Sequence, residues 1–497
     1  MKRICAIAFF AAAILSATAQ TNSAVRSVTL QNCFSEALAH NLDLQVQRYA
    51  PQVSLYDLYA AYGGYDPTFS LSGQHSYNLS PGGLDQNQLP FPATTTESDS
   101  FRSSIGGALP TGLQYNFSGN IADTYGSTSP TNLFENSGGS ISVNLAQPLL
   151  KNFWTDGTRL AISVAKNRVK YTEQGLRSQV ITTVTAVENA FYELIYAREN
   201  VTVQQQALDL ARKQLEDDKQ RVELKVLAER GGTIEQDEAQ VASSRASLIS
   251  AQFSHAAAQN ALKVLLTDDY ARWHDVELVP AAPMEAVQQR FDVQDSWSQG
   301  LAQRPDLIQA KLDVEQMGLR LKYSFNQLFP QLDLVGSYGF NGRSKEFSGV
   351  FSQIDEGNAP FYSLGAQFSV PLSNTRARNS YKSTKAGQEQ ILLRLKQLEQ
   401  NIMVQIDNAV KQAQSAWESV DATRQARIYA EVALEAEQGK YAAGKSTTFT
   451  VLQLQSRLTS ARSQEIRSLA NYNEALTNLA RQEGSTLERR QIDFKAK

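Results

Sequence analysis

The chain has 497 residues, of which 42% are hydrophobic and 20% charged, and its formal net charge is −3. This near-neutral balance excludes a sequence-independent nucleic-acid binder, which needs a basic surface. The mean hydropathy of −0.35 excludes a bundle of membrane-spanning helices. All 14 prolines lie at or before Pro371, and residues 149–279 and 372–497 contain none. Because proline breaks helices, we expect very long helices in both stretches.

The N-terminus carries the pattern of an export signal. A basic start with Lys2 precedes the apolar run 4–15, and Ala17 and Ala19 then provide the small residues of a cleavage site. We expect a cleaved signal peptide over residues 1–19, because the apolar run is too short to anchor the chain across a bilayer. No cysteine follows the cleavage site, so a lipoprotein is not expected. The single cysteine that remains allows no intrachain disulfide.

The first structural repeat, residues 28–280, begins with a helix and continues with strands. Apolar residues lie at helical spacing after Thr29. The period then changes to two, which predicts strands over 66–78 and 137–148. Between them the segment 99–125 alternates as well. Two interpretations of that segment remain open: two extra barrel strands, or an extracellular loop.

The expected strands have one apolar face and one face of small polar residues. Leu334 and Tyr338, for example, alternate with Asp333 and Ser337. This pattern is typical of outer-membrane barrels, although the strands of a soluble β-sandwich alternate in the same way. No later stretch is apolar over the roughly 18 residues that a spanning helix needs. If the chain enters a membrane, it must therefore do so as a β-barrel.

A seven-residue period runs through the long helix expected from about residue 160 to 227. The apolar positions of this period are Val180, Val187, Leu194, Val201, Leu208, Leu215 and Val222. Such a period predicts a left-handed coiled coil. At about 1.5 Å per residue the helix reaches on the order of 100 Å, which is longer than an ordinary domain core. A turn near residue 231 and a returning helix over about 234–266 complete the hairpin.

The second structural repeat, residues 281–484, has the same order of elements. Residues 29–73 align with 292–336 without gaps, which indicates an internal duplication. The shared residues include Gln31 and Gln294, Leu38 and Leu301, Asp43 and Asp306, Pro67 and Pro330, and Gly73 and Gly336. The elements expected in this repeat are strands over 330–341 and 361–371 and a long helical hairpin that turns near 444. A polar tail over 485–497 follows the repeat.

A protomer with so few strands cannot form a barrel by itself. Strands in lipid leave no open edge, because each unpaired backbone group is costly there. The smallest spanning barrels have about eight strands. We therefore expect the protomer to share its sheet with further copies in a cyclic arrangement.

The order of the elements and two short motifs are the most specific features of the chain. Gln147-Pro148 ends a strand, and Tyr441-x-x-Gly444 is followed by Val451-Leu452 and an alanine-rich helix. With the duplicated plan, these features resemble the TolC-like outer membrane efflux proteins over residues 28–484. The resemblance implies a mixed α and β channel-tunnel. Its parts are an outer-membrane β-barrel in contact with lipid and a long periplasmic α-helical coiled-coil barrel.

The same resemblance implies an assembly and a role. The expected assembly is a homotrimer with twelve barrel strands, or eighteen if the segment 99–125 contributes two more. The expected partners are a periplasmic adaptor and an inner-membrane transporter. Together they form a tripartite efflux or type I secretion system, for which this protein is the exit duct.

In this family the two helix–helix turns close the periplasmic end. An acidic residue six positions after the turn glycine commonly contributes to the constriction, and Asp237 holds that position after Gly231. Glu235 and Glu238 are expected to add to this acidic lining. The alternative for all three acids is a solvated helix start, where negative charge is favourable.

The second turn departs from the family pattern. Thr450 and Gln453 stand six and nine positions after Gly444, where acids are often found. A simple double ring of aspartates is therefore in doubt. Tyr441 matches the aromatic residue beside the family's gate, and packing in the helix seam is the alternative for it.

The sequence has no motif for catalysis or for a bound metal or cofactor. It contains no Walker loop, HExxH, CxxC or G-x-S-x-G motif, and its four histidines are scattered. An enzyme is therefore not expected. A periplasmic coiled-coil adaptor or an adhesin is the rival interpretation from another class. An adaptor would show one helical hairpin within lipoyl-like sequence, whereas two hairpins and lipid-type strands are expected here.

Overall fold

The computed structural model describes residues 25–129, 132–223 and 233–493. The expected signal peptide and Gly231 lie outside these residues. The chain divides into two compact units. The helical unit consists of the residues up to Gln45, Val180–Ser296 and Ile406–Ile492, and the sheet unit contains Val46–Gln179 and Trp297–Gln405.

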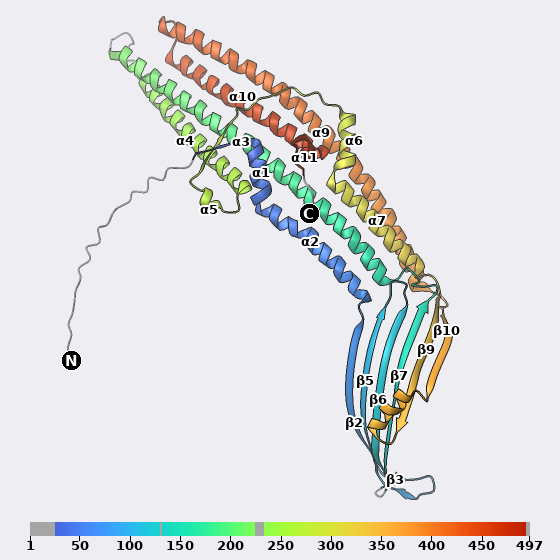
Figure 1. Cartoon of the computed structure of the whole chain (residues 1–497). Coiled ribbons are helices and arrows are strands. Elements are labelled where there is room, and N and C mark those ends of the chain that lie inside the picture. The colour runs from blue at the N-terminus through green and yellow to red at the C-terminus, as the bar shows by residue number, and fades with distance from the viewer. Residues whose placement is uncertain (1–24, 130–131, 224–232, 494–497) are drawn as a thin grey trace, which may run out of the picture. The chain divides into compact units, whose positions relative to one another are not determined.

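The sheet unit contains one antiparallel sheet with the strand order β10-β9-β7-β6-β5-β2 (Figure 1). Its strands are β2 (Thr68–Ser80), β5 (Thr94–Ala108), β6 (Gln114–Ser129), β7 (Asn132–Pro148), β9 (Gln331–Ser344) and β10 (Pro360–Ser369). Most of the segment 99–125 thus belongs to β5 and β6, which lie between β2 and β7 in the sheet. The segment therefore forms two extra strands of the sheet rather than a separate loop. Within the described part of the chain, the short strands β3 (Gly83–Leu84) and β4 (Pro90–Phe91) pair only with each other.

The register separates an apolar face of the sheet from a polar face. On the apolar face Phe101, Ile121 and Gly139 are successive cross-strand neighbours. The polar face carries serine hydroxyls that contact one another across strand pairs. These pairs are Ser70–Ser104 at 2.7 Å, Ser118–Ser142 at 3.1 Å and Ser337–Ser363 at 2.7 Å. The alternation expected from the sequence therefore becomes two chemically distinct surfaces.

A short helix, α8 (Phe347–Glu356), covers part of the apolar face. Its Val350 is fully buried, and a Cβ atom on Gly139 would lie 3.1 Å from Val350 Cγ1. The rings of Phe347 and Phe101 meet edge to face at 6.1 Å. Glycine in the strand therefore makes room for the helix.

Four long or medium helices have all or part of their residues in the sheet unit. They are α2 (Leu42–Tyr62), α3 (Gly157–Glu223), α7 (Pro305–Asn326) and α9 (Thr375–Ala442). α3 and α9 contribute residues to both units. No helix among the described residues is long and apolar enough to cross a membrane.

The helical unit is built on the seven-residue seam. Val180, Val187 and Leu194 are fully buried, and Leu208 is 2% exposed. The remaining helices are α1 (Leu30–His40), α4 (Thr233–Leu266), α5 (Tyr270–Trp273), α6 (Val293–Gln303), α10 (Thr448–Glu483) and α11 (Thr486–Arg489). The strands β1 (Val25–Val28) and β8 (Glu277–Pro280) pair in parallel. The coiled-coil seam expected along α3 is thus buried at these positions.

Candidate gate at the helix ends

Four helix ends meet in the helical unit. They are the end of α3, the start of α4, the end of α9 and the start of α10. Gly444 makes the turn between α9 and α10 with a φ of 73°, a left-handed conformation that glycine adopts without steric cost. Thr447 then caps α10, and its side chain accepts a hydrogen bond from the Thr450 backbone N–H. The tight α9–α10 connection expected from the sequence is formed by these residues.

Tyr441 is buried in the centre of this group. It packs with Leu434, Val451 and Leu458 in one apolar cluster. Its hydroxyl donates to Asp218 Oδ1 at 2.5 Å. Burial, followed by this hydrogen bond, raises the pKa of Tyr441 to about 12. The phenol is therefore protonated throughout the ordinary pH range and acts as a donor.

Asp218, at the end of α3, is the acceptor of the group. It is fully buried, and its Oδ2 accepts hydrogen bonds from Thr448 Oγ1 and Gln214 Nε2, both at 3.0 Å. Donors from three helices thus converge on one buried carboxyl group. The sequence interpretation missed Asp218. A signal for it exists in the sequence, because Ala190, Ala197 and Ala211 recur beside the seam at multiples of seven residues. Asp218 continues this series of small residues, where an acid is out of place.

Asp237, near the start of α4, is also fully buried. Neither of its carboxylate oxygens meets a hydrogen-bond donor among the described residues. Burial, and then the charge of Asp218, raise the pKa of Asp237 to about 7. The side chain of Asp237 is therefore buried between the helices of the single chain, whereas the flanking acids Glu235 and Glu238 are exposed.

The other predicted gate residues lie at the surface. Glu235 and Glu238 are exposed, and Glu238 forms an ion pair with Lys219 of α3 at 3.4 Å. Gln453 is exposed, whereas Thr450 is half-buried and takes part in the N-cap of α10. The structure therefore brings Tyr441 and Asp237 into one buried group with Asp218, and leaves the remaining acids at its outside.

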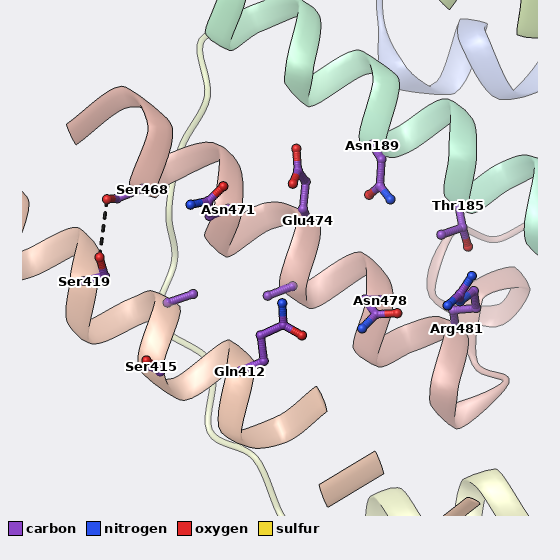
Figure 2. Close-up of a pocket in the computed structure, with 12 residues that line it drawn as sticks. Thr185, Asn189, Gln412, Ser415, Ser419, Ser468, Asn471, Glu474, Asn478 and Arg481 are labelled. Carbon is purple, nitrogen blue, oxygen red and sulfur yellow. Dashed lines mark hydrogen bonds between the residues drawn. The ribbon is translucent and has the colours of Figure 1, made fainter. Parts of the chain in front are cut away.

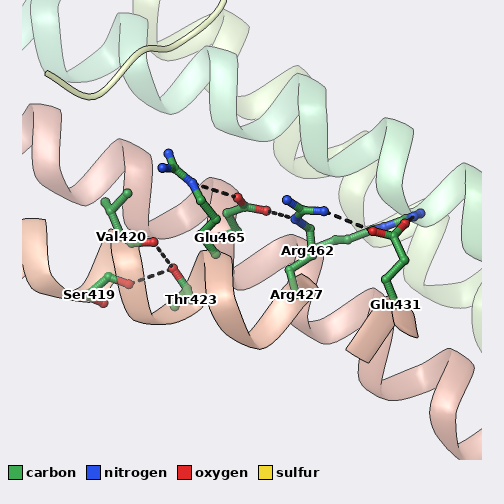
Figure 3. A network of polar contacts seen from close by, with 8 residues as sticks. Ser419, Val420, Thr423, Arg427, Glu431, Arg462 and Glu465 are labelled. Atoms are coloured by element: carbon green, nitrogen blue, oxygen red, sulfur yellow. Dashed lines mark hydrogen bonds and ion pairs between the residues drawn. The ribbon is translucent and has the colours of Figure 1, made fainter. Parts of the chain in front are cut away.

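An ion-pair network holds α9 against α10 farther from the turn (Figure 3). Arg427 Nε lies 2.6 Å from Glu465 Oε2, and Arg462 Nη2 lies 2.6 Å from Glu431 Oε1. The guanidinium of Arg462 keeps the pKa of Glu431 below its usual value. Exposed pairs are worth little singly, but this network spans two helices and fixes their register.

A polar cavity of about 620 Å³ lies between α3, α9 and α10 within the helical unit (Figure 2). Amides and hydroxyls dominate its lining, with one acid, Glu474, and one base, Arg481. Burial raises the pKa of Glu474, and the nearby Arg467 opposes this effect. The Oδ1 atom of Asn189 has no hydrogen-bond partner among the described residues. These groups suit a hydrated surface better than a dry core.

The described residues contain no group of three histidine, cysteine or acidic side chains that would hold a metal ion. The one cysteine outside the expected signal peptide, Cys33, is buried, and burial raises the pKa of its thiol to about 11. A raised pKa is the opposite of what a nucleophilic cysteine needs.

Comparisons with known proteins concern the family and the fold of the chain. A family model described as outer membrane efflux protein matches residues 297–485. No curated protein sequence is significantly similar to the chain. Several solved structures share its fold. The CmeC outer membrane channel of Campylobacter jejuni is 14% identical, with a TM-score of 0.66 over 92% of this chain and 86% of that chain.

Two further structures show the same likeness. The outer membrane protein VceC of Vibrio cholerae is 19% identical, with a TM-score of 0.65 over 92% of this chain and 96% of that chain. The open state of the MtrE outer membrane channel of Neisseria gonorrhoeae is 17% identical, with a TM-score of 0.65 over 92% and 89%. CmeC and MtrE are outer-membrane channels. Residues 297–485 thus match the outer membrane efflux protein family by sequence, and the chain as a whole shares the fold of these outer-membrane proteins.

Proposed function

We propose that this protein is the outer-membrane exit duct of a tripartite efflux or type I secretion system. After removal of residues 1–19, three copies form a β-barrel in the outer membrane and a helical tunnel in the periplasm. A periplasmic adaptor and an inner-membrane transporter deliver the substrate to it. The observation that carries this proposal is a six-stranded sheet with two open edges and an apolar face.

The open edges require partner strands. Among the described residues, β2 pairs only with β5, and β10 only with β9. Phe69 and Leu71 on β2 are 64% and 71% exposed, and Tyr362 and Leu364 on β10 are 82% and 79% exposed. Edge strands of this length are pairing sites. Closing β2 of one copy on β10 of the next satisfies both edges, and lipid then covers the apolar face.

Three copies of this sheet give eighteen strands rather than twelve. Barrels of about this size leave an aqueous channel. The polar face, with its serine pairs, then lines the channel and offers hydroxyl groups to water.

Helix α2 supports the same assembly. Val46, Tyr49, Val53 and Tyr56 follow one another at spacings of three and four residues, and all are between 56% and 71% exposed. Apolar positions with this spacing are the contact positions of a coiled coil. We assign this stripe to contacts between neighbouring protomers in the trimer.

The gate lies at the periplasmic helix turns in this proposal. Gly231 and Gly444 mark the turns, and the gate further comprises Glu235, Asp237, Glu238, Tyr441, Thr450 and Gln453. Docking of the adaptor rotates the α9–α10 hairpin about Gly444. This motion breaks the hydrogen bond between Tyr441 and Asp218, and the constriction widens.

Membrane fractionation and electrophoresis with and without heating test the assembly. A heat-sensitive trimer in the outer membrane is expected, and a soluble monomer would overturn the channel. Single-channel conductance in planar bilayers tests the gate. Tyr441→Phe removes the donor to Asp218 and is expected to raise conductance or open probability. Tyr429→Phe, on the same helix but 68% exposed, is the control. Unchanged conductance in both Tyr441→Phe and Asp237→Ala would remove the gate from these residues.

A further inference from the structure

The four helix ends of the candidate gate enclose two carboxyl groups with opposite surroundings. Asp218 receives hydrogen bonds from Tyr441, Thr448 and Gln214. Asp237 is equally buried, yet no donor among the described residues reaches its two oxygens. An ionised carboxylate without donors is strongly disfavoured in such a place.

A proton on Asp237 removes this difficulty. A protonated carboxyl is a hydrogen-bond donor, and the adjacent Asp218 is the acceptor. Asp218 already accepts three hydrogen bonds, so the proton is placed on Asp237. The pair then carries one negative charge, and Asp237 links α4 to α3.

No cation among the described residues pairs with Asp237. On α3, Lys219 pairs with Glu238, and Arg221 stacks over the Tyr441 ring at 4.6 Å. On α9, Lys440 pairs with Glu437 at 2.8 Å. From α10 the group is met by Thr448, which is uncharged, and on α4 Glu235 is a further acid. These three described cations thus have other partners.

We propose that Asp218 and Asp237 share one proton that holds α3 and α4 together at the gate, and that loss of this proton at higher pH releases them. The proposal deepens the gate function proposed above and rests on it. When the proton leaves, two buried negative charges face each other, and only one of them has donors. The closed arrangement then loses stability relative to an open one in which water reaches Asp237.

The direction of the pH effect follows from linkage. The pKa of Asp237 is raised to about 7 in this closed arrangement, whereas a hydrated aspartate titrates near 4. The closed state therefore binds the proton more tightly and is favoured at low pH. Its advantage decreases as pH rises through this range and is lost above about pH 7.

Conductance of the purified protein in planar bilayers, measured from about pH 5 to pH 9, tests this inference. Open probability of the wild type is expected to rise with a midpoint near pH 7. Asp237→Asn keeps a donor to Asp218 without a titrating proton, and is expected to remain closed and lose the transition. Asp218→Asn supplies an amide donor to Asp237 and is expected to move the midpoint downward by more than about one pH unit. Asp217→Asn, an exposed neighbour on α3 with the same charge change, is expected to keep the wild-type midpoint.

Hydrogen–deuterium exchange of the same preparations gives a readout that does not depend on conduction. After correction for intrinsic exchange, the end of α3 and the start of α4 are expected to lose protection as pH rises, and Asp237→Asn to keep it. A pH transition that persists unchanged in Asp237→Asn would overturn the shared proton. Absence of any conductance, with the exchange transition intact, would instead overturn the channel proposal and leave the proton pair standing.

Discussion

A buried ion pair between Arg490 and Glu188 links the C-terminal end of the described chain to α3. Its removal tests how much this contact stabilises the helical unit. Glu188 is 1% exposed, and Arg490 contacts both of its oxygens. Tyr192 donates a further hydrogen bond to Glu188 at 3.3 Å. Burial raises the pKa of Glu188, and the charge of Arg490 opposes this effect. The change to make is Arg490→Met, which keeps the aliphatic stem and removes the charge.

The loss of unfolding free energy expected for Arg490→Met follows from the uncompensated charge of Glu188. Removing one partner of a buried ion pair typically costs 3–5 kcal/mol, because the other charge is left without compensation. The side chain of Arg490 is 30% exposed, so water relieves part of the loss, and we expect about 3 kcal/mol near pH 7.5. Without the guanidinium the pKa of Glu188 rises further. The folded variant then binds a proton that the unfolded chain releases, so its stability deficit shrinks as pH falls toward about 5.

Guanidinium unfolding followed by circular dichroism measures this cost. Arg272→Met is the control, because Arg272 forms a surface pair with Asp269 and its side chain is 85% exposed. Its loss is expected to cost less than about 1 kcal/mol. The double variant Glu188→Gln/Arg490→Met is expected to recover part of the stability. A cost below about 1 kcal/mol for Arg490→Met, or a cost that does not change with pH, would refute the reasoning.

Three further predictions concern single residues. Gly444→Ala forces a side chain into the left-handed region at a φ of 73°, and thermal unfolding is expected to show a loss of about 1 kcal/mol. Gly139→Val places a Cβ 2.7 Å from the Asn120 carbonyl oxygen and 3.1 Å from Val350 Cγ1. Helix α8 is therefore expected to pack less tightly on the sheet, and trypsin is expected to cleave faster after Lys345. Burial raises the pKa of the Cys33 thiol to about 11, so iodoacetamide at about pH 8 is expected to label it about 100-fold more slowly than in denaturant.

Each of these has a matched comparison. Gly439→Ala lies inside α9 with no atom within 4 Å of its Cβ, and it is expected to leave stability equal or slightly higher. Gly138→Val points to the other face, where the nearest atom is 3.9 Å away, and it is expected to leave α8 protected. Equal effects within either glycine pair would contradict the packing described. Rapid labelling of Cys33 in the folded protein would contradict its burial.

The sequence by itself determined the local form of the chain. The seven-residue period from Val180 onward predicted the long helix α3, because the apolar stripe of a coiled coil repeats along one helix and needs no knowledge of its partner. Alternation predicted the strands for the same reason, since side chains of a strand point to opposite faces in turn. The turn at Gly444 was also readable, because few other residues adopt its backbone conformation.

Only the tertiary structure decided which distant segments meet. The strands over 99–125 alternate equally well as a loop hairpin or as sheet strands, and their pairing with β2 and β7 settled the matter. Tyr441 was singled out in the sequence, but its partner Asp218 lies 223 residues away. The burial of Asp237 between helices was equally invisible. Periodicity is a property of neighbouring residues, whereas strand pairing, a buried hydrogen bond and a shifted pKa depend on the fold that brings remote residues together.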